Sequence, residues 1–408
     1  MTLIECYTAS HIDNLAACLR LQPDQMILVG DVEEAAPAAE RYQALLQKRR
    51  IPTELILCDM TGQDFIGIYR LLKQLIGDSG ECVIDLTGGN ELVIMAVGAV
   101  VAELDHRKRS KIRVQRYDRA SDHYTVCCGS KPASPEIPAS ITVEELLFLH
   151  GGTLHPDHQQ PPEDYPVHAL DRLWSLVVED PRQWNRAVAQ LNELESRTES
   201  DGLSVSIPID LLKRTVSGFE DKEEAVRTFL SRLHRCGAIE DRSTRDRLEY
   251  TYASTMMRCC LQKAGNALEL KVLLEGRAAT ENGAPFFQDC RMSVGIDWDG
   301  ILHNPMARIP ETRNEIDVVM IHNMTPLFIS CKNGQIGEEE LYKLHTVATR
   351  FGGPNVKKML IATELNQKSA FSNRAFMQRA WDMDIFLVTD AADLNNDEWA
   401  EILRRAVN

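Results

Sequence analysis

An acidic residue and a lysine stand on two neighbouring strand-like runs in NEIDVVMIHNMTPLFISCKNG, residues 314–334. Asp317 lies near the start of the first run, Lys332 ends the second, and the letters HNMT between the runs are a plausible turn. A hairpin would bring both side chains to one end of a sheet. There a carboxylate can hold a divalent cation, and a lysine can stabilise charge that develops on phosphorus. Taken alone, Lys332 is more typical of a solvated strand end.

A third acid precedes the hairpin. Glu269 lies on a predicted amphipathic helix, next to Leu268 of its apolar stripe. It could reach the same cation from the opposite side, or it could belong to a solvated face. Glu315 alternates with Asp317 on one face of its strand, so it is either a further carboxylate at the metal or an exposed edge charge.

A second candidate site lies near the N-terminus. The tetrapeptide TGGN, residues 87–90, follows a strand-like run and precedes a helical pattern. A glycine pair at the N-terminus of a helix can form a nest of backbone N–H groups for a phosphate, although an ordinary strand–helix turn has the same letters. The tripeptide TAS, residues 8–10, would lie at the same edge of the sheet. Because neither segment is GxGxxG or a Walker loop, NAD binding and ATP hydrolysis are disfavoured.

The hydrophobic pattern predicts an α/β protein with three regions. Residues 1–150 alternate strand-like runs with helical patterns, as in a parallel, doubly wound Rossmann-like sheet. Residues 151–254 begin with a linker rich in proline, glycine and histidine, and continue as helices and a charged hairpin in the order of a winged helix. Residues 255–408 begin with a helix and then alternate strands and helices. The strands are expected at 3–7, 26–29, 53–58, 82–86, 111–117, 292–298, 316–322, 327–331, 358–363 and 385–388.

The composition limits the class of protein. A net charge of −15 over 408 residues disfavours a non-specific coat for nucleic acid, but it allows a nuclease with a local basic patch. The eleven cysteines show no metal-binding spacing, so structural zinc is not expected. Scattered cysteines of this kind predict a protein of the reducing cytoplasm. The N-terminus does not have the pattern of a signal peptide, and the longest apolar run, 92–102, is too short to span a membrane.

The C-terminal pattern resembles the PD-(D/E)xK, restriction-endonuclease-like nucleases over about residues 264–390. The letters that carry the resemblance are NEIDVV and FISCKNG, with Glu269 before them and EEELYKLHTVATRFGG after them. The resemblance implies that Asp317 binds Mn²⁺ or Mg²⁺, that Lys332 is the catalytic lysine and that Glu269 is the acid on the helix. Ser330 departs from the family, which has a second acid there, and serine is a poor ligand for such cations.

Three outcomes are open for the missing acid. The backbone carbonyl of Cys331 can still bind the metal, Glu340 or its neighbours Glu338 and Glu339 can supply a carboxylate, or the site is inactive. Since Asp317, Lys332 and Glu269 occur together, we expect an active site in which Glu340 takes part.

The N-terminal pattern resembles the CARF domains, the CRISPR-associated Rossmann-fold sensors, over about residues 1–130. DLTGGNELVIMAVGAV and TAS carry this resemblance. Together, the two resemblances match type III CRISPR ancillary nucleases, antiviral enzymes in which cyclic oligoadenylate, typically cyclic tetra-adenylate, binds a CARF homodimer and activates a nuclease for DNA or single-stranded RNA. A two-fold symmetric ligand suits such a dimer axis. The implied ligand-facing residues are Ser10, Thr87, Gly88, Gly89 and Asn90, with Thr61 as a weaker candidate.

The main alternative is a transcriptional regulator that responds to a cyclic nucleotide. In that interpretation the winged-helix-like region binds DNA and the nuclease domain is degenerate. The acids around Asp317 and Lys332 discriminate between the two hypotheses, because a regulator has no need of them.

Overall fold

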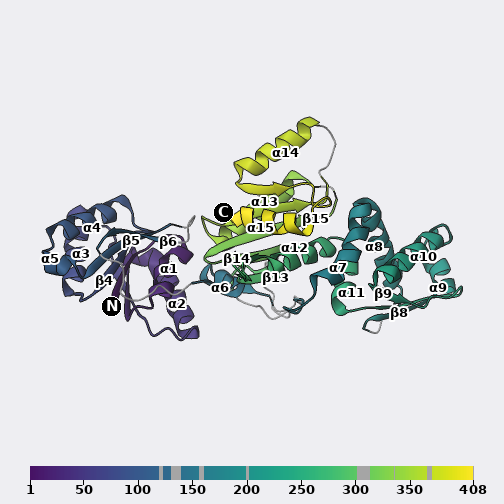
Figure 1. Cartoon of the computed structure of the whole chain (residues 1–408), viewed down its shortest axis with the longest axis horizontal. Helices are drawn as coiled ribbons and strands as arrows, with labels where there is room; N and C mark the ends of the chain where they lie inside the picture. The colour runs from purple at the N-terminus through teal and green to yellow at the C-terminus, as the bar shows by residue number, and fades with distance from the viewer. Residues whose placement is uncertain are drawn as a thin grey trace.

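The computed structural model describes residues 1–118, 123–129, 139–155, 160–198, 202–300, 313–334, 336–364 and 370–407. Two six-stranded sheets and a smaller three-stranded sheet follow one another along the molecule, as Figure 1 shows. The N-terminal sheet lies at one end, the C-terminal sheet lies in the middle, and the three-stranded sheet lies at the other end. No helix among the described residues is long and apolar enough to cross a membrane.

The N-terminal sheet has the strand order β3-β2-β1-β4-β5-β6. Strands β1 to β5 are parallel, as predicted, while β6 is an antiparallel edge strand that the sequence pattern did not indicate. The chain order reverses between β1 and β4, and ligands of open α/β sheets bind at such a point. The elements are β1 (Thr2–Cys6), α1 (His11–Leu21), β2 (Gln25–Gly30), α2 (Val32–Lys48), β3 (Glu54–Asp59), α3 (Phe65–Asp78), β4 (Cys82–Asp85), α4 (Glu91–Glu103), α5 (His106–Arg109), β5 (Ile112–Asp118) and β6 (His123–Cys128).

The middle of the chain contains a winged-helix-like unit. Two helices, α9 and α10, precede the β9–β10 hairpin, and β8 pairs with β10, so the order of elements agrees with the sequence prediction. The residues before this unit are not a plain linker, because α6 packs on the C-terminal sheet and β7 pairs with β13 as an edge strand of that sheet. The elements are α6 (Val143–Leu149), β7 (Thr153–Leu154), α7 (Val167–Glu179), α8 (Pro181–Glu195), β8 (Ser204–Pro208), α9 (Ile209–Thr215), α10 (Phe219–Cys236), β9 (Ile239–Asp241), β10 (Arg247–Tyr252) and α11 (Thr255–Gln262).

The C-terminal sheet has the order β17-β16-β15-β14-β13-β7. Strands β13, β14 and β15 form an antiparallel meander, and β16 and β17 run parallel to β15 after helical crossovers. The elements are α12 (Asn266–Ala278), β11 (Thr280–Glu281), β12 (Ala284–Pro285), β13 (Asp289–Asp297), β14 (Arg313–His322), β15 (Thr325–Lys332), α13 (Glu338–Gly352), β16 (Lys357–Ala362), α14 (Ala370–Asp382), β17 (Ile385–Val388) and α15 (Asn396–Val407).

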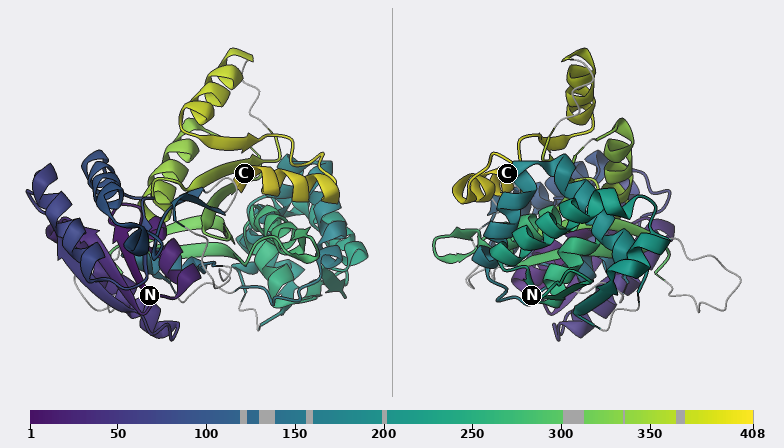
Figure 2. Two further views of the ribbon diagram at one scale, coloured as in Figure 1. Left: turned by 60° about the vertical axis from the view of Figure 1, so that its left-hand side comes forward. Right: turned by 90° about the vertical axis from the view of Figure 1, so that its right-hand side faces the viewer.

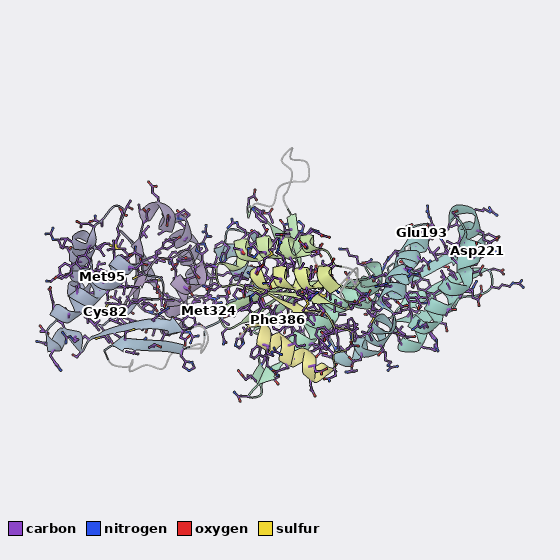
Figure 3. All side chains as sticks on the ribbon, turned by 90° about the horizontal axis from the view of Figure 1, so that it is seen from above. Cys82, Met95, Glu193, Asp221, Met324 and Phe386 are labelled. Atoms are coloured by element: carbon purple, nitrogen blue, oxygen red, sulfur yellow. The ribbon has the colours of Figure 1, made fainter. Side chains whose placement is uncertain are left out.

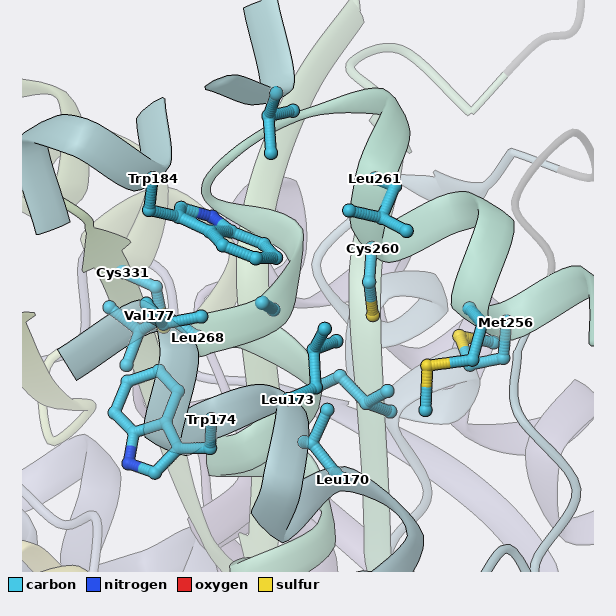
Figure 4. Close-up of a cluster of buried hydrophobic side chains, with 14 of the residues drawn as sticks. Leu170, Leu173, Trp174, Val177, Trp184, Met256, Cys260, Leu261, Leu268 and Cys331 are labelled. Carbon is cyan, nitrogen blue, oxygen red and sulfur yellow. The ribbon is translucent and has the colours of Figure 1, made fainter. Parts of the chain in front are cut away.

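Both faces of the C-terminal sheet are covered by apolar side chains. On one face, α12 packs with α7, α8 and α11, and Figure 4 shows Leu268 of α12 and Cys331 of β15 in the same cluster as Trp174 and Trp184. On the other face, the apolar core continues through α6 to α1 and α2 of the N-terminal region. Burying an aliphatic or aromatic side chain contributes about 1.5–3 kcal/mol, so α12 and β15 are held rigidly where their polar residues emerge.

Candidate functional sites

Asp317 is held by three donors from the neighbouring strand β15. Its Oδ2 accepts hydrogen bonds from Ser330 Oγ at 3.0 Å, from the Cys331 backbone N–H at 2.6 Å and from Lys332 Nζ at 3.3 Å. Ser330 therefore orients the carboxylate and adds no second negative charge. Among the described residues, the hydrogen bonds to Asp317 end on Oδ2, which leaves Oδ1 for a cation.

Lys332 lies between two carboxylates. Besides Asp317, its Nζ contacts Glu340 Oε2 of α13 at 3.2 Å, and Lys343 Nζ donates to Glu340 Oε1 at 2.9 Å. Burial lowers the pKa of Lys332, but Asp317 and Glu340 outweigh burial and raise that pKa above its usual value. Lys332 is therefore a fixed positive charge and not a base. The structure thus brings Glu340 to the cluster, whereas Glu338 and Glu339 are exposed.

Glu269 of α12 is buried on the other side of Asp317. Ser293 Oγ of β13 donates to Glu269 Oε2 at 3.3 Å. Ser293 lies opposite Asp317 and has a left-handed φ of 48°, where the β13–β14 pairing is interrupted. Burial, then the charge of Asp317 and then that of Glu315 raise the pKa of Glu269 from 4.5 to about 8. Glu315 itself is partly exposed, with Lys263 at 4.0 Å.

The donor set fits a hard divalent cation. Within the described part of the chain, no three His, Cys, Asp or Glu side chains converge as a metal site. However, Mg²⁺ usually keeps several waters and needs only one or two carboxylates, and the charge of Asp317 already raises the pKa of Glu269. A cation between these two carboxylates would relieve that repulsion. Burial of Glu269 beside the partly exposed Asp317, whose Oδ1 is left open, is the observation that supports the fit.

The raised pKa of Glu269 predicts how stability changes with pH in EDTA. The folded protein keeps a proton that the unfolded chain loses near pH 4.5, so this contribution to stability disappears as the pH rises from 4.5 through about 8. Glu269→Gln is therefore expected to be neutral near pH 4.5 and stabilising above pH 8, by an amount on the order of a few kcal/mol. Thermal unfolding across this range measures it. Glu339→Gln, an exposed control, should show no such trend; an equal trend in both variants would contradict the assignment.

The residue after Lys332 is fixed by α8. Asn185 Nδ2 donates to the Asn333 carbonyl at 2.7 Å, and Asn333 Nδ2 donates back to Asn185 Oδ1 at 2.9 Å. Thr363 Oγ1 also donates to Asn333 Oδ1 at 2.8 Å. Asn185 was not predicted, because a polar residue on an amphipathic helix normally faces solvent.

The N-terminal region contains a cavity of about 420 Å³ at the carboxyl ends of β1, β2 and β4. Four of the six predicted ligand-facing residues line it: Thr61, Gly88, Gly89 and Asn90. A Cβ on Gly88 would lie 2.4 Å from the Cys6 carbonyl oxygen, so the loop packs on β1 only because Gly88 has no side chain. At Gly89 a Cβ would lie 3.4 Å from Ile94 and 3.5 Å from Cys6, which are ordinary van der Waals distances, so this position tolerates a Cβ. Asn90 caps α4 by accepting from the Val93 N–H at 3.0 Å.

The other two predicted residues do not line this cavity. The Thr87 hydroxyl donates to Asp85 Oδ1 and accepts from the Tyr117 N–H at 2.9 Å. Thr87 therefore attaches the TGGN loop to β4 and β5. Ser10 is buried at the start of α1. Asp31 and Glu34 line the cavity and were missed, although Asp31 directly follows β2. Carboxylates suit the amino groups of nucleobases better than they suit phosphates.

A chain of hydrogen bonds leads from this cavity into α1 and α2. The Asn14 side chain brackets the cavity-lining Thr8, because Asn14 Oδ1 accepts from the Thr8 N–H at 3.0 Å and Asn14 Nδ2 donates to the Thr8 carbonyl at 2.7 Å. Asn14 Nδ2 also donates to the Tyr42 hydroxyl at 2.9 Å, and that hydroxyl bonds to His11 Nδ1 at 2.8 Å.

The chain of contacts continues into the C-terminal region through a pair of histidines. The His11 ring lies edge-to-face on the His150 ring, with centroids 4.9 Å apart. Arg350 of α13 donates to the His150 carbonyl at 2.9 Å, and α13 also carries Glu340. Burial lowers the pKa of His11 to about 3 and that of His150 to about 4, so both rings are neutral. The cavity and the carboxylate–lysine cluster are thus joined by continuous contacts.

Two solved structures resemble the whole chain. Protein VC1899 from Vibrio cholerae superimposes with a TM-score of 0.71 at 17% identity, covering 100% of this chain and 97% of that one. Can2 from Sulfobacillus thermosulfidooxidans, solved in complex with cyclic tetra-adenylate, gives a TM-score of 0.62 at 16% identity, with coverage of 100% and 99%. No protein-family model matches the sequence, and no curated protein shows significant similarity to it. The chain therefore shares its complete three-part α/β fold with VC1899 and with Can2.

Proposed function

We propose that the protein is a metal-dependent endonuclease of type III CRISPR defence that cyclic oligoadenylate, most simply cyclic tetra-adenylate, activates. The observation that carries this proposal is the cluster of Asp317, Glu269 and Lys332, held in one chain with a glycine-lined cavity at a sheet switch point. The fold shared with Can2, whose structure contains cyclic tetra-adenylate, supports the choice of ligand.

The chain's own residues divide the chemistry between them. Asp317 and Glu269, with the backbone carbonyl of Cys331, would hold Mn²⁺ or Mg²⁺. When bound, that cation supplies an activated water and polarises the phosphate. Lys332 keeps its proton and stabilises the charge that develops on the phosphate oxygens. Glu340 keeps the ammonium in place, and Ser330 keeps Asp317 turned toward β15.

The direct test is a cleavage assay with matched ligands. Supercoiled DNA and single-stranded RNA are incubated with the protein and Mn²⁺ or Mg²⁺, with cyclic tetra-adenylate, with linear tetra-adenylate or without ligand. Cleavage is expected only with the cyclic ligand and the metal, and EDTA should stop it. If no combination of substrate, metal and cyclic oligoadenylate ring size gives ligand-dependent cleavage, the proposed function is wrong.

A regulator that binds DNA is the second candidate. Ser330 in the place of an acid, and the lack of a third metal-binding side chain among the described residues, favour it. Such a protein would bind a DNA duplex in response to cyclic tetra-adenylate. It would not cleave the duplex, whether or not metal is present. Changes in the β9–β10 hairpin, such as Arg247→Glu, would then reduce binding.

Tyr42→Phe is expected to weaken activation more than ligand binding. The substitution removes the hydroxyl that joins Asn14 to His11, so His11 Nδ1 loses its hydrogen bond and Asn14 keeps only its bonds to Thr8. Ligand-stimulated cleavage should fall by roughly 2- to 30-fold, while affinity for cyclic tetra-adenylate changes little. Titration calorimetry and cleavage rates measure the two effects. Tyr69→Phe, which loses a surface contact with Glu103, is the matched control; equal losses in both variants would contradict coupling through Tyr42.

A further inference from the structure

A groove of about 410 Å³ lies at the edge of the C-terminal sheet that β17 forms, away from β13. The end of α14, the starts of β16 and β17 and the end of α15 form its walls. Helix α14 projects from the body of the molecule in the views of Figures 1 and 2, and Figure 3 labels Phe386 of β17, one of the groove residues. Nothing in the proposed chemistry uses this groove.

The groove is locally basic in a strongly acidic chain. Lys357, Lys358 and Arg405 line it, and Asp384 is the acid among its described lining residues. Lys358 is only 8% exposed, and its Nζ contacts His345 Nδ1 at 3.5 Å. Among the described residues no carboxylate lies within ion-pair distance of Lys358, although the charge of Asp384 acts on it. Burial lowers the pKa of Lys358, and the charge of Asp384 offsets this only in part, so a phosphate beside the ammonium would stabilise it. The lining therefore suits phosphate groups.

The same groove presents an exposed aromatic ring. Trp381 is 80% exposed, and Met377, one turn earlier on the same face of α14, is 51% exposed. Across the groove, the Arg405 guanidinium lies 5.8 Å from the centre of the Phe386 ring. Free aromatic faces beside cations are what proteins use to stack unpaired bases along a charged backbone. A duplex does not offer its base faces to Trp381, and an apolar protein partner would not call for the three cations.

We propose that this groove binds an unpaired nucleic-acid strand, with phosphates on Lys357, Lys358 and Arg405 and a base stacked on Trp381. The proposal rests on the proposed nuclease function and deepens it, because it places a binding site for the strand outside the carboxylate–lysine cluster. Lys357 pairs with Leu327, five residues before Lys332 on β15, so the groove begins roughly 17 Å from the catalytic lysine along the strand.

The test measures binding without cleavage. Fluorescence anisotropy of labelled oligothymidylate, oligouridylate and a short duplex is followed in EDTA with the full-length protein. Trp381→Ala should weaken binding of the single strands by roughly 5- to 100-fold, and Trp381→Phe should keep most of it. Lys357→Gln should reduce the slope of log affinity against log salt by about 0.7. Comparing the two oligonucleotides shows whether the strand is DNA or RNA.

The control is Tyr342→Ala, because Tyr342 is another exposed aromatic residue of the same region that does not line the groove. A loss in Trp381→Ala but not in Tyr342→Ala supports the proposal. It is overturned if single strands do not bind, if Trp381→Ala binds them as the wild type does, or if light scattering shows that Trp381→Ala instead dissociates an oligomer. Because EDTA suppresses cleavage, each result stands whether or not the chain proves to be a nuclease.

Discussion

Lys332→Ala is expected to reduce metal-dependent cleavage by roughly 10²- to 10³-fold or more, while the binding of cyclic tetra-adenylate stays unchanged. The reason is that Lys332 is the positive charge next to Asp317, and its raised pKa keeps it protonated at neutral pH. The rate of cleavage at saturating ligand and metal is the measurement. The loss should appear in kcat more than in KM, since the charge that it stabilises develops in the transition state.

Lys343→Ala is the matched control for this variant. Lys343 also contacts Glu340, at 2.9 Å, but it is largely exposed and does not touch Asp317. It should keep most of the activity. If Lys332→Ala cleaves as fast as Lys343→Ala does, the cluster of Asp317, Glu269 and Lys332 is not the active site. Folding is checked by the melting temperature, because removing Lys332 leaves Asp317 and Glu340 facing each other.

Gly89→Glu is expected to abolish activation because it prevents the ligand from binding. Gly89 lines the cavity and tolerates a Cβ, and a carboxylate there would add negative charge beside the phosphates of an anionic ligand. Placing like charges together costs several kcal/mol, which corresponds to a loss of affinity of roughly 100-fold or more. Titration calorimetry with cyclic tetra-adenylate measures this loss, and cleavage without ligand should not change.

Gly98→Glu is the control for the added charge. Gly98 lies on α4, the helix that follows the TGGN loop, and nothing lies within 4 Å of the place where its Cβ would be. It adds the same carboxylate to the helix that follows the loop, at a residue that does not line the cavity. Similar affinities for Gly89→Glu and Gly98→Glu would place the ligand away from the loop. Gly88 is unsuitable for this test, because any side chain there meets β1 and could unfold the region.

The predictable parts of the structure are those with local causes. The alternation of apolar runs and helical patterns identified the five parallel strands, and the turn letters between β14 and β15 identified the hairpin that places Asp317 beside Lys332. The two residues are close because strand pairing turns a sequence separation into a fixed neighbourhood. Glu269 was found by its position on a helix, and Glu340 by its position at the start of the next one.

The parts that were missed depend on contacts between distant segments. β6 and β7 are edge strands that exist because another strand is there to pair with, and β7 has only two residues. Thr87 stays a predicted ligand residue, and only the structure shows that its hydroxyl accepts from the Tyr117 N–H of the neighbouring strand. Ser330 likewise looks like a lost acid, and only the structure shows that it donates to Asp317.

Helix α6 has a consequence for how this protein can be divided. Leu146, Leu147 and Leu149 are completely buried between the two large sheets. On one side Arg49 pairs with Glu145, and on the other side Asp289 accepts from the Val143 N–H at 2.9 Å. A chain cut near residue 150 would leave apolar surface on both pieces. The N-terminal and C-terminal regions are therefore not interchangeable modules, and a substitution in one should shift the melting of both together.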